Sequence, residues 1–214
     1  VWTSPMSWGS WMLIIFFPLA TLQALIVNER WLEGFSLVNR IIQPSKKHLN
    51  LIAMINVHMG AGIGVYTGIL LSTFYARPIW SSSILGFVFL MSGLSSAAAL
   101  VMLMAPRREK LMFSKMDMYF ISLEGFATTL FIIGGITGSE NVRDAMYFLI
   151  SGPYAPWFWV VFVMGGMIVP LMLETLEAIG RIRFTVLVPL LVLTGSLTLR
   201  FIIVYAGQAF PTFA

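Results

Sequence analysis

The stretch from Leu49 to Tyr75 decides the fold, and its central residues 56–68 read NVHMGAGIGVYTG. At a helical rise of about 1.5 Å per residue the stretch is long enough to cross a bilayer, although it carries a histidine, a tyrosine and several glycines. Wound as a helix, it places Gly60, Gly64 and Gly68 on one face, about one turn apart. Because such a row of glycines lets another helix approach closely, we expect this face to be a packing surface.

A second row on the same helix carries polar groups. His58, Gly62 and Tyr66 also repeat every fourth residue, and this row lies about 200° around the helix from the glycine row. We therefore expect this face to place His58 and Tyr66 around a gap left by Gly62. On this interpretation the other helices support and position that face.

The composition indicates an all-α integral membrane protein. Of its 214 residues, 58% are hydrophobic and 10% are charged, whereas a soluble domain carries roughly 25% charged residues. Apolar stretches of membrane-spanning length recur without the period-two alternation of an outer-membrane barrel. We predict a single domain over residues 1–214, with six transmembrane helices in a bundle and interfacial helices in the loops. The predicted spans are 6–27, 49–75, 79–104, 117–137, 157–179 and 184–205.

Cysteine and histidine usage limits the cofactors that this protein can hold. It has no cysteine and two histidines, which excludes a disulfide or a thiolate-held iron–sulfur cluster of its own. His48 is expected at the membrane boundary and His58 inside it, so the two cannot bind opposite sides of one haem. We expect no haem, iron–sulfur cluster or metal site in this chain, and no nucleic-acid partner. The opening residues VWTSP lack the positive charge of a signal peptide, so we expect none there.

The basic residues predict the orientation of the chain. Most of the thirteen Lys and Arg residues fall in the first, third and fifth loops, which share one side of the membrane. The positive-inside rule makes that side cytoplasmic, so both ends of the chain are predicted on the periplasmic side. These residues are Arg30, Arg40, Lys46, Lys47, Arg107, Arg108, Lys110, Lys115, Arg181 and Arg183.

Two loops have the pattern of helices that lie on the membrane surface. In Asn28–Asn50, apolar residues recur at helical spacing between charged ones, which predicts an interfacial helix on the cytoplasmic side. On the outer side, Ser139–Ile150 is predicted to form a helix capped by Ser139 and ended at Gly152. Aromatic residues follow it, which is typical of an anchor at the headgroup level. This outer loop offers a surface for docking a soluble partner.

Ionisable residues inside the predicted spans are the candidate functional residues, because each costs about 2.5–3.5 kcal/mol at the bilayer centre. Glu124 shares one helical stripe with Asp117 and Thr128. Desolvation disfavours the charged form of a carboxyl group at that depth. Glu124 is therefore either a neutral acid satisfied by a neighbouring helix or one step of a proton route from the cytoplasm.

The fifth span carries Glu174 and Glu177 on one face, beyond a kink expected at Pro170. For Glu177 a surface ion pair with Arg181 is the favoured interpretation. Glu174 lies deeper and is the better candidate for the mouth of a proton route. His58 either carries a proton or makes a structural hydrogen bond to a backbone carbonyl.

Tyr66 and Arg200 are both expected in the outer third of the membrane, Tyr66 about 25 Å from the cytoplasmic side. Ser196 lies one turn below Arg200 on the same face. Either Arg200 extends its guanidinium to the outer headgroups, or Tyr66 and Arg200 line an outer pocket. A direct ion pair between Arg200 and Glu124 is not expected, because their depths differ by more than about 10 Å.

Four short motifs occur in order along the chain and resemble one family. They are SPMSWGSW at residues 4–11, VYTGILL at 65–71, GGMIVPL at 165–171, and LRFIIV at 199–204 followed by Gly207 and Gln208. Together they resemble the polysulfide reductase membrane subunit family, of the NrfD/PsrC type, over nearly the whole chain.

The resemblance implies a cofactor-free, quinone-binding anchor in a bacterial cytoplasmic membrane. Members of the family exchange electrons with an outward-facing, ferredoxin-like iron–sulfur subunit, which is joined to a molybdopterin or multihaem catalytic subunit. The resemblance also implies a menaquinone site near the outer face, and the quinone-site tyrosine of the family is similar in position to Tyr66. Members usually have eight spans in two four-helix bundles, and this chain resembles the last six.

The favoured function is quinol oxidation or quinone reduction as a subunit of a respiratory oxidoreductase, without a redox cofactor in this chain. Tyr66 would hydrogen-bond a quinone oxygen in a pocket with Gly62, Ser196 and Arg200. Arg200 would stabilise a negatively charged intermediate. Protons from the cytoplasm, and possible proton translocation, would use a relay of His58, Asp117, Glu124, Thr128 and Glu174.

Two alternatives belong to other classes of protein. A proton-coupled secondary transporter would suit the buried acids and kinked spans, although such transporters usually show an internal repeat with interrupted helices in both halves. No such pairing is visible in the sequence. The other alternative is a structural anchor that holds an enzyme to the membrane and has no quinone site.

Overall fold

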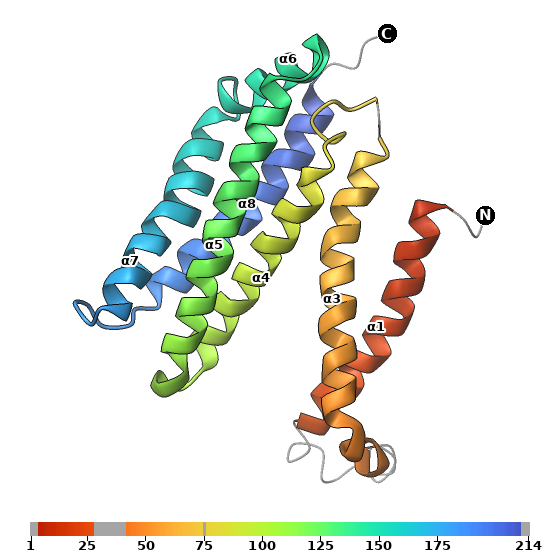
Figure 1. Ribbon diagram of the computed structural model, residues 1–214, viewed down its shortest axis with the longest axis vertical. Helices are drawn as coiled ribbons and strands as arrows, with labels where there is room; N and C mark the ends of the chain where they lie inside the picture. The colour runs from red at the N-terminus through yellow and green to blue at the C-terminus, as the bar shows by residue number, and fades with distance from the viewer. Residues whose placement is uncertain (1–3, 28–41, 75, 211–214) are drawn as a thin grey trace. The chain divides into compact units, whose positions relative to one another are not determined.

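The computed structural model describes residues 4–27, 42–74 and 76–210, and the regular elements in these ranges are all helical (Figure 1). Six helices are long and apolar enough to cross a membrane. The prediction of an all-α integral membrane protein with six spans is therefore confirmed. The elements are α1 (Pro5–Val27), η2 (Lys46–His48), α3 (Leu49–Ser72), α4 (Ile84–Met104), α5 (Arg107–Ile136), α6 (Glu140–Ile150), η3 (Trp157–Ile168), α7 (Val169–Ala178) and α8 (Leu187–Ala209).

Two spans begin five or more residues away from their predicted starts. Helix α5 starts at Arg107, ten residues before the predicted Asp117, directly after Pro106 in extended conformation. Residues 107–116 are mostly good helix formers, so the basic cluster continues the helix instead of forming a loop. Helix α4 starts at Ile84 rather than at residue 79, because turns around Pro78 and the following serines precede it. Asp117 consequently lies inside the bundle rather than at its edge.

The two predicted interfacial helices have different outcomes. Helix α6 follows Ser139, where it was predicted to begin, although the Ser139 side chain makes no capping hydrogen bond, and it buries Ala145, Met146 and Leu149. It packs against α5, α8 and η3. For the loop predicted on the cytoplasmic side, residues 28–41 lie outside the described residues, and residues 42–45 are helical and lead through η2 into α3.

The chain divides into two compact units, Val1–Tyr66 and Thr67–Ala214, and the boundary falls within α3. In the first unit, α1 and α3 run antiparallel, because residues later in α1 face residues earlier in α3. Tyr66 packs on Gly9, whereas Asn56 donates to Gln23 at 2.6 Å. A hydrogen bond between side-chain amides stabilises the contact of two membrane helices, where the hydrophobic effect does not drive helix association.

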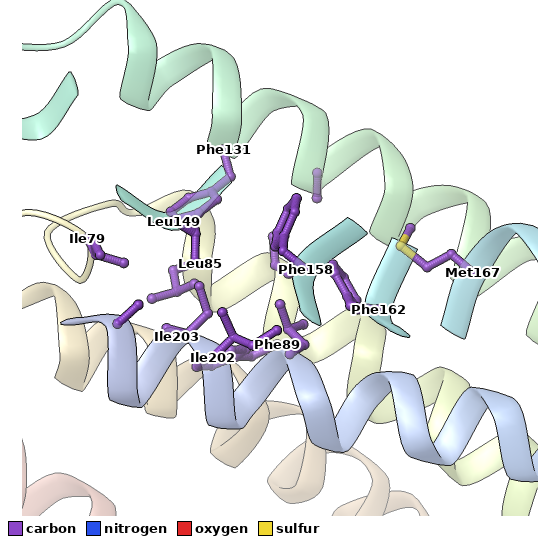
Figure 2. Close-up of a cluster of buried hydrophobic side chains, with 14 of the residues drawn as sticks. Ile79, Leu85, Phe89, Phe131, Leu149, Phe158, Phe162, Met167, Ile202 and Ile203 are labelled. Carbon is purple, nitrogen blue, oxygen red and sulfur yellow. The ribbon is translucent and has the colours of Figure 1, made fainter. Parts of the chain in front are cut away.

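The second unit is a bundle of four long helical segments: α4, α5, η3 with α7, and α8. Helix α4 packs on α5 and α8, and η3 packs on α8. Figure 2 shows the apolar core toward one end of the bundle, where side chains from α4, α5, α6, η3 and α8 meet. Residues labelled there include Phe89, Phe131, Leu149, Phe158 and Ile203.

The fifth span changes its winding before the proline at which a kink was expected. Residues of η3 form a π-helix, and the backbone N–H of Val169 donates to the carbonyl oxygen of Met164, five residues back, before α7 begins with Pro170 in its first turn. Proline has no N–H and crowds the carbonyl four residues earlier, so a wider turn ahead of it relieves that conflict. Gly166 on this wider turn lies against Gly195 of α8, and a Cβ on either would overlap the other's backbone.

Candidate functional site in the second unit

Arg200 of α8 turns its guanidinium into the bundle. Its Nη1 donates to the carbonyl oxygen of Ser196 at 3.0 Å and also to the Ser196 hydroxyl. The guanidinium carbon lies 5.9 Å from the ring centroid of Phe89, and Gly93 leaves space beside Nη2. Helical side chains lean toward the N-terminus of their helix, which directs Arg200 toward Ser196 and away from the nearer helix end. The interpretation that Arg200 extends to the outer headgroups is therefore wrong.

Ser196 joins Arg200 to helix α4. The hydroxyl of Ser92 donates to Ser196 Oγ at 2.8 Å, and both serines are buried. Ser96 in turn donates to the backbone carbonyl of Ser92. The guanidinium is thereby held by a serine that is itself bonded to the neighbouring helix α4.

Glu124 of α5 is buried beside this pair of serines, with 3% of its surface exposed. Ser92 lies within reach of its carboxyl group, and Arg200 acts on it electrostatically. Its Oε1 has no hydrogen-bond partner among the described residues. Arg200 thus acts on Glu124 through space while its Nη1 donates to Ser196, and Glu124 keeps an oxygen available for another donor.

Two further acids meet nearer the other end of the bundle. Asp117 of α5 and Glu174 of α7 are both fully buried, and their carboxyl groups lie within hydrogen-bonding reach of each other. Ser95 of α4 donates to Asp117 Oδ1 at 2.5 Å. Within the described ranges, Asp117 Oδ2 and both carboxyl oxygens of Glu174 have no donor. The pair consequently holds three oxygens that need a proton or a donor.

Glu177 lies one turn beyond Glu174, and its hydrogen-bond partner differs from the predicted one. Its Oε1 accepts hydrogen bonds from the backbone N–H of Thr185 at 2.9 Å and from the Thr185 hydroxyl at 3.2 Å. It is 6% exposed, so the surface ion pair with Arg181 is corrected to a buried link between α7 and the start of α8. A small cavity of about 10 Å³ lies beside Glu177 and Lys110, close to the smallest volume that holds one water.

Two further polar residues of α5 extend the row of buried side-chain oxygen atoms formed by Asp117 and Glu124. Thr128 lies one turn beyond Glu124, and Ser114 lies one turn before Asp117. The hydroxyl of each is buried without a partner in the part of the chain that the structure describes. Buried polar groups are normally hydrogen-bonded, so orphaned oxygens at regular intervals indicate places for water or protons.

The serines of α4 bridge the gap between the acids of α5. Asp117 and Glu124 are separated by about 10 Å along their helix. Ser95 bonds Asp117, and Ser92, one turn away on α4, lies within reach of Glu124. The arrangement brings together Asp117, Glu124 and Glu174 with Ser196 and Arg200, in a line that could pass protons along the bundle.

Sequence reasoning missed Ser92 and Ser95. Their signal was a run of small residues, SSAAA at 95–99, together with Ser92 one turn earlier. Because serine is common in transmembrane helices as a packing residue, the run by itself does not distinguish a polar relay from close helix packing.

The predicted residues of the first unit have their own surroundings. The ring of Tyr66 lies against Gly9, where a Cβ would overlap it, and Met12 Sδ lies beside the expected gap at Gly62. His58 is exposed, and its Nδ1 lies 2.8 Å from the carbonyl oxygen of Met54, in the structural arrangement considered as the alternative to proton transfer. Tyr66 and Gly62 belong to the first unit, and Arg200 and Ser196 to the second. Their grouping in one quinone pocket stays a prediction, as does a proton role for His58.

Comparison with known proteins identifies the family. The family described as "Polysulphide reductase, NrfD" matches residues 1–212, nearly the whole chain. The chain belongs to this family. It is 30% identical to protein NrfD of Escherichia coli over 86% of the chain and 61% of that protein. It is 28% identical to one of the chains of polysulfide reductase from Wolinella succinogenes, over 97% of the chain and 70% of that relative.

The NrfD-family chain spans less than the full length of these relatives. It covers 64% of a protein NrfD homolog from Haemophilus influenzae and 46% of a tetrathionate reductase subunit from Salmonella typhimurium. No solved structure matches it closely enough to be significant. Six apolar helices and family membership together establish a multi-pass membrane protein.

Proposed function

We propose that this NrfD-family chain is the quinone-interacting membrane subunit of a reductase complex and delivers protons to the quinone site. The observation that carries the proposal is the line of buried acids and serines that leads to the inward-turned Arg200 in the second unit. Burying so many ionisable groups in a membrane helix bundle is expensive, which favours a functional use. Relatives named for polysulfide and tetrathionate reductases support a role within a reductase.

The available side chains suit a quinone in their chemistry. Quinone reduction consumes two electrons and two protons, and the carbonyl oxygens of a quinone accept hydrogen bonds. Arg200 presents several N–H donors and a positive charge, and Tyr66 presents a hydroxyl group. Arg200 would hold negative charge near the quinone oxygens, and Glu124 would exchange a proton with them or with intervening water.

The partners in the proposal come from the family. An iron–sulfur subunit of ferredoxin type on the outer side would exchange electrons with menaquinone, and a molybdopterin or multihaem subunit would carry the terminal reaction. Within this scheme the chain itself holds no redox group. It positions the quinone and supplies protons from the cytoplasmic side, which would couple electron transfer to proton movement.

The experiment compares two activities of the complex that copurifies with the full-length protein. Quinone-linked turnover requires the membrane subunit, whereas turnover with a soluble viologen dye bypasses it. Tyr66→Phe is expected to lower the quinone-linked rate several-fold, up to about tenfold for a lost hydrogen bond of about 1.4 kcal/mol, and to leave the dye-linked rate intact. Tyr119→Phe, at a tyrosine 63% exposed on α5, is the matched control. Unchanged quinone-linked turnover in Tyr66→Phe would remove Tyr66 from the site, and a complex with no quinone-linked turnover at all would favour a structural anchor.

A further inference from the structure

The carboxyl groups of Asp117 and Glu174 face each other in the interior of the second unit, one on α5 and one on α7. Both residues are fully buried. Ser95 donates to Asp117 Oδ1 at 2.5 Å, and the other three carboxyl oxygens have no donor among the described residues. The two groups lie within hydrogen-bonding reach of each other.

Two ionised carboxylates cannot satisfy each other, because each offers only acceptor oxygens. Like charges at this separation repel strongly where water is excluded. Two further acids add negative charge near the pair: Glu177, one turn along α7, and Glu124, which interacts with Asp117.

We propose that Asp117 and Glu174 act as one acid that holds a single proton between them. One proton converts an acceptor into a donor, so that the protonated carboxyl bonds the ionised one. Ser95 completes the ionised partner's hydrogen bonds through Asp117 Oδ1. The pair then carries one negative charge instead of two, and neither residue binds the proton independently of the other.

The position of the pair makes the proton exchangeable. Glu177 follows Glu174 by one turn, and the cavity of about 10 Å³ beside Glu177, Lys110 and Thr185 has room for about one water. Ser114, one turn before Asp117, has a buried hydroxyl with no partner in the described ranges. On the other side, Ser95 and Ser92 lead toward Glu124. The pair therefore binds a proton at a position between the cytoplasmic end and the interior of the bundle. This use rests on the proposed function.

The shared proton can be tested without turnover, by infrared spectroscopy of the purified full-length protein in lipid. The readout is the C=O stretching band of protonated carboxyl groups, which is separated from the bands of ionised carboxylates. Asp117→Asn and Glu174→Gln each replace one acid by an amide that can donate to the remaining carboxylate. The expected result is that either single substitution abolishes the whole band of the pair, because the remaining acid then gives up its proton.

Other outcomes would overturn the proposal. If each substitution removes only part of the band and leaves a second component, the two acids hold separate protons. If the wild-type protein shows no band that both substitutions remove, the pair is not protonated. If the band is present but disappears when Na⁺ is added at constant pH, the pair binds a metal cation in place of the proton. Glu109→Gln, at an acid in the first turn of α5, is the control that leaves the band unchanged.

A milder variant covers the case in which the amide variants fail to fold. Ser95→Ala removes the hydroxyl that donates to Asp117 Oδ1 but keeps both acids. The band is expected to keep its intensity and to shift in frequency, because the pair keeps its proton and loses one donor; loss of the band or absence of a shift would contradict the arrangement.

Exchange into D₂O tests the shared proton of the pair separately from the proposed quinone function. The band is expected to shift on exchange if the pair lies on a proton route, whereas a band that never shifts would refute its place on such a route. If the band behaves as expected but Asp117→Asn leaves quinone-linked turnover unchanged, the shared proton stands and its use in quinone chemistry fails.

Discussion

The contact between Gly166 and Gly195 predicts a large effect from one added methyl group. A Cβ at Gly195 would overlap the backbone of Gly166 on the facing helix, not the end of a side chain that can rotate away. Gly195→Ala must therefore move η3 and α8 apart. Overpacking of this kind costs about 1–3 kcal/mol.

The expected shift in thermal stability follows from the size of the chain. For 150–250 residues, about 1 kcal/mol corresponds to roughly 2–4 °C in Tm, so Gly195→Ala should lower the apparent Tm by about 2–12 °C. Purified protein in one detergent can be followed by tryptophan fluorescence during heating. Because Ser196 is the next residue, separation of the helices should also weaken its bonds to Ser92 and Arg200 and lower quinone-linked turnover.

A matched variant distinguishes packing from the general effect of replacing glycine in a helix. Gly134→Ala, in the last turn of α5, meets no heavy atom within 4 Å of its new Cβ. Alanine favours a helix by about 1 kcal/mol over glycine, so this variant should unfold at the wild-type temperature or slightly above it. A Gly195→Ala protein as stable as wild type would refute the close approach of η3 and α8.

Three further predictions concern the end of the bundle at which α8 finishes and the first unit. Arg77 donates to the carbonyl oxygens of Gly207, Gln208 and Phe210 at the end of α8, so Arg77→Gln should lower stability by about 1–3 kcal/mol in thermal unfolding, whereas Arg143→Gln, at an exposed arginine, should not. Trp80→Phe removes the indole N–H bond to the carbonyl oxygen of Ile203 at 2.8 Å and should cost about 1 kcal/mol in the same assay; an unchanged Tm would contradict this bond. Gly9→Ala should displace the Tyr66 ring and lower quinone-linked turnover as Tyr66→Phe does, whereas Gly60→Ala, whose Cβ would lie 3.9 Å from Phe16, should be tolerated. Equal turnover of these two glycine variants would argue against the Tyr66 contact.

Much of the fold could be predicted from the sequence because the lengths of the apolar runs determine the number and the approximate positions of the spans. Each span is a long apolar run, and the start and stop signals at Ser139 and Gly152 place the short helix α6. The start of α5 was misjudged because charged residues usually mark the end of a span, whereas here Pro106 sets the helix start and the charged residues continue it. Periodicity also does not reveal a change from α- to π-helical winding, even where a proline such as Pro170 predicts a kink.

The candidate site could be predicted in part. Burial cost alone singles out Glu124, Glu174 and Arg200, which lie in one bundle, and their role in a site stays a prediction. The direction of Arg200 and the pairing of Asp117 with Glu174 depend on which helices are neighbours, and one sequence does not contain that information. Glu177 illustrates the same limit, since its partner Thr185 lies across a turn and the obvious candidate was Arg181.

The most direct test of proton delivery through the second unit is the ratio of quinone-linked to dye-linked turnover in a Glu124→Gln complex. The substitution keeps the shape of a side chain that is 3% exposed and removes its exchangeable acid. If Glu124 passes protons to the quinone site, the ratio should fall by at least about tenfold, because positioned acids and bases typically contribute about 10²–10⁴-fold. Glu109→Gln on the same helix should leave it unchanged. A wild-type ratio in an assembled Glu124→Gln complex would contradict proton delivery by this route.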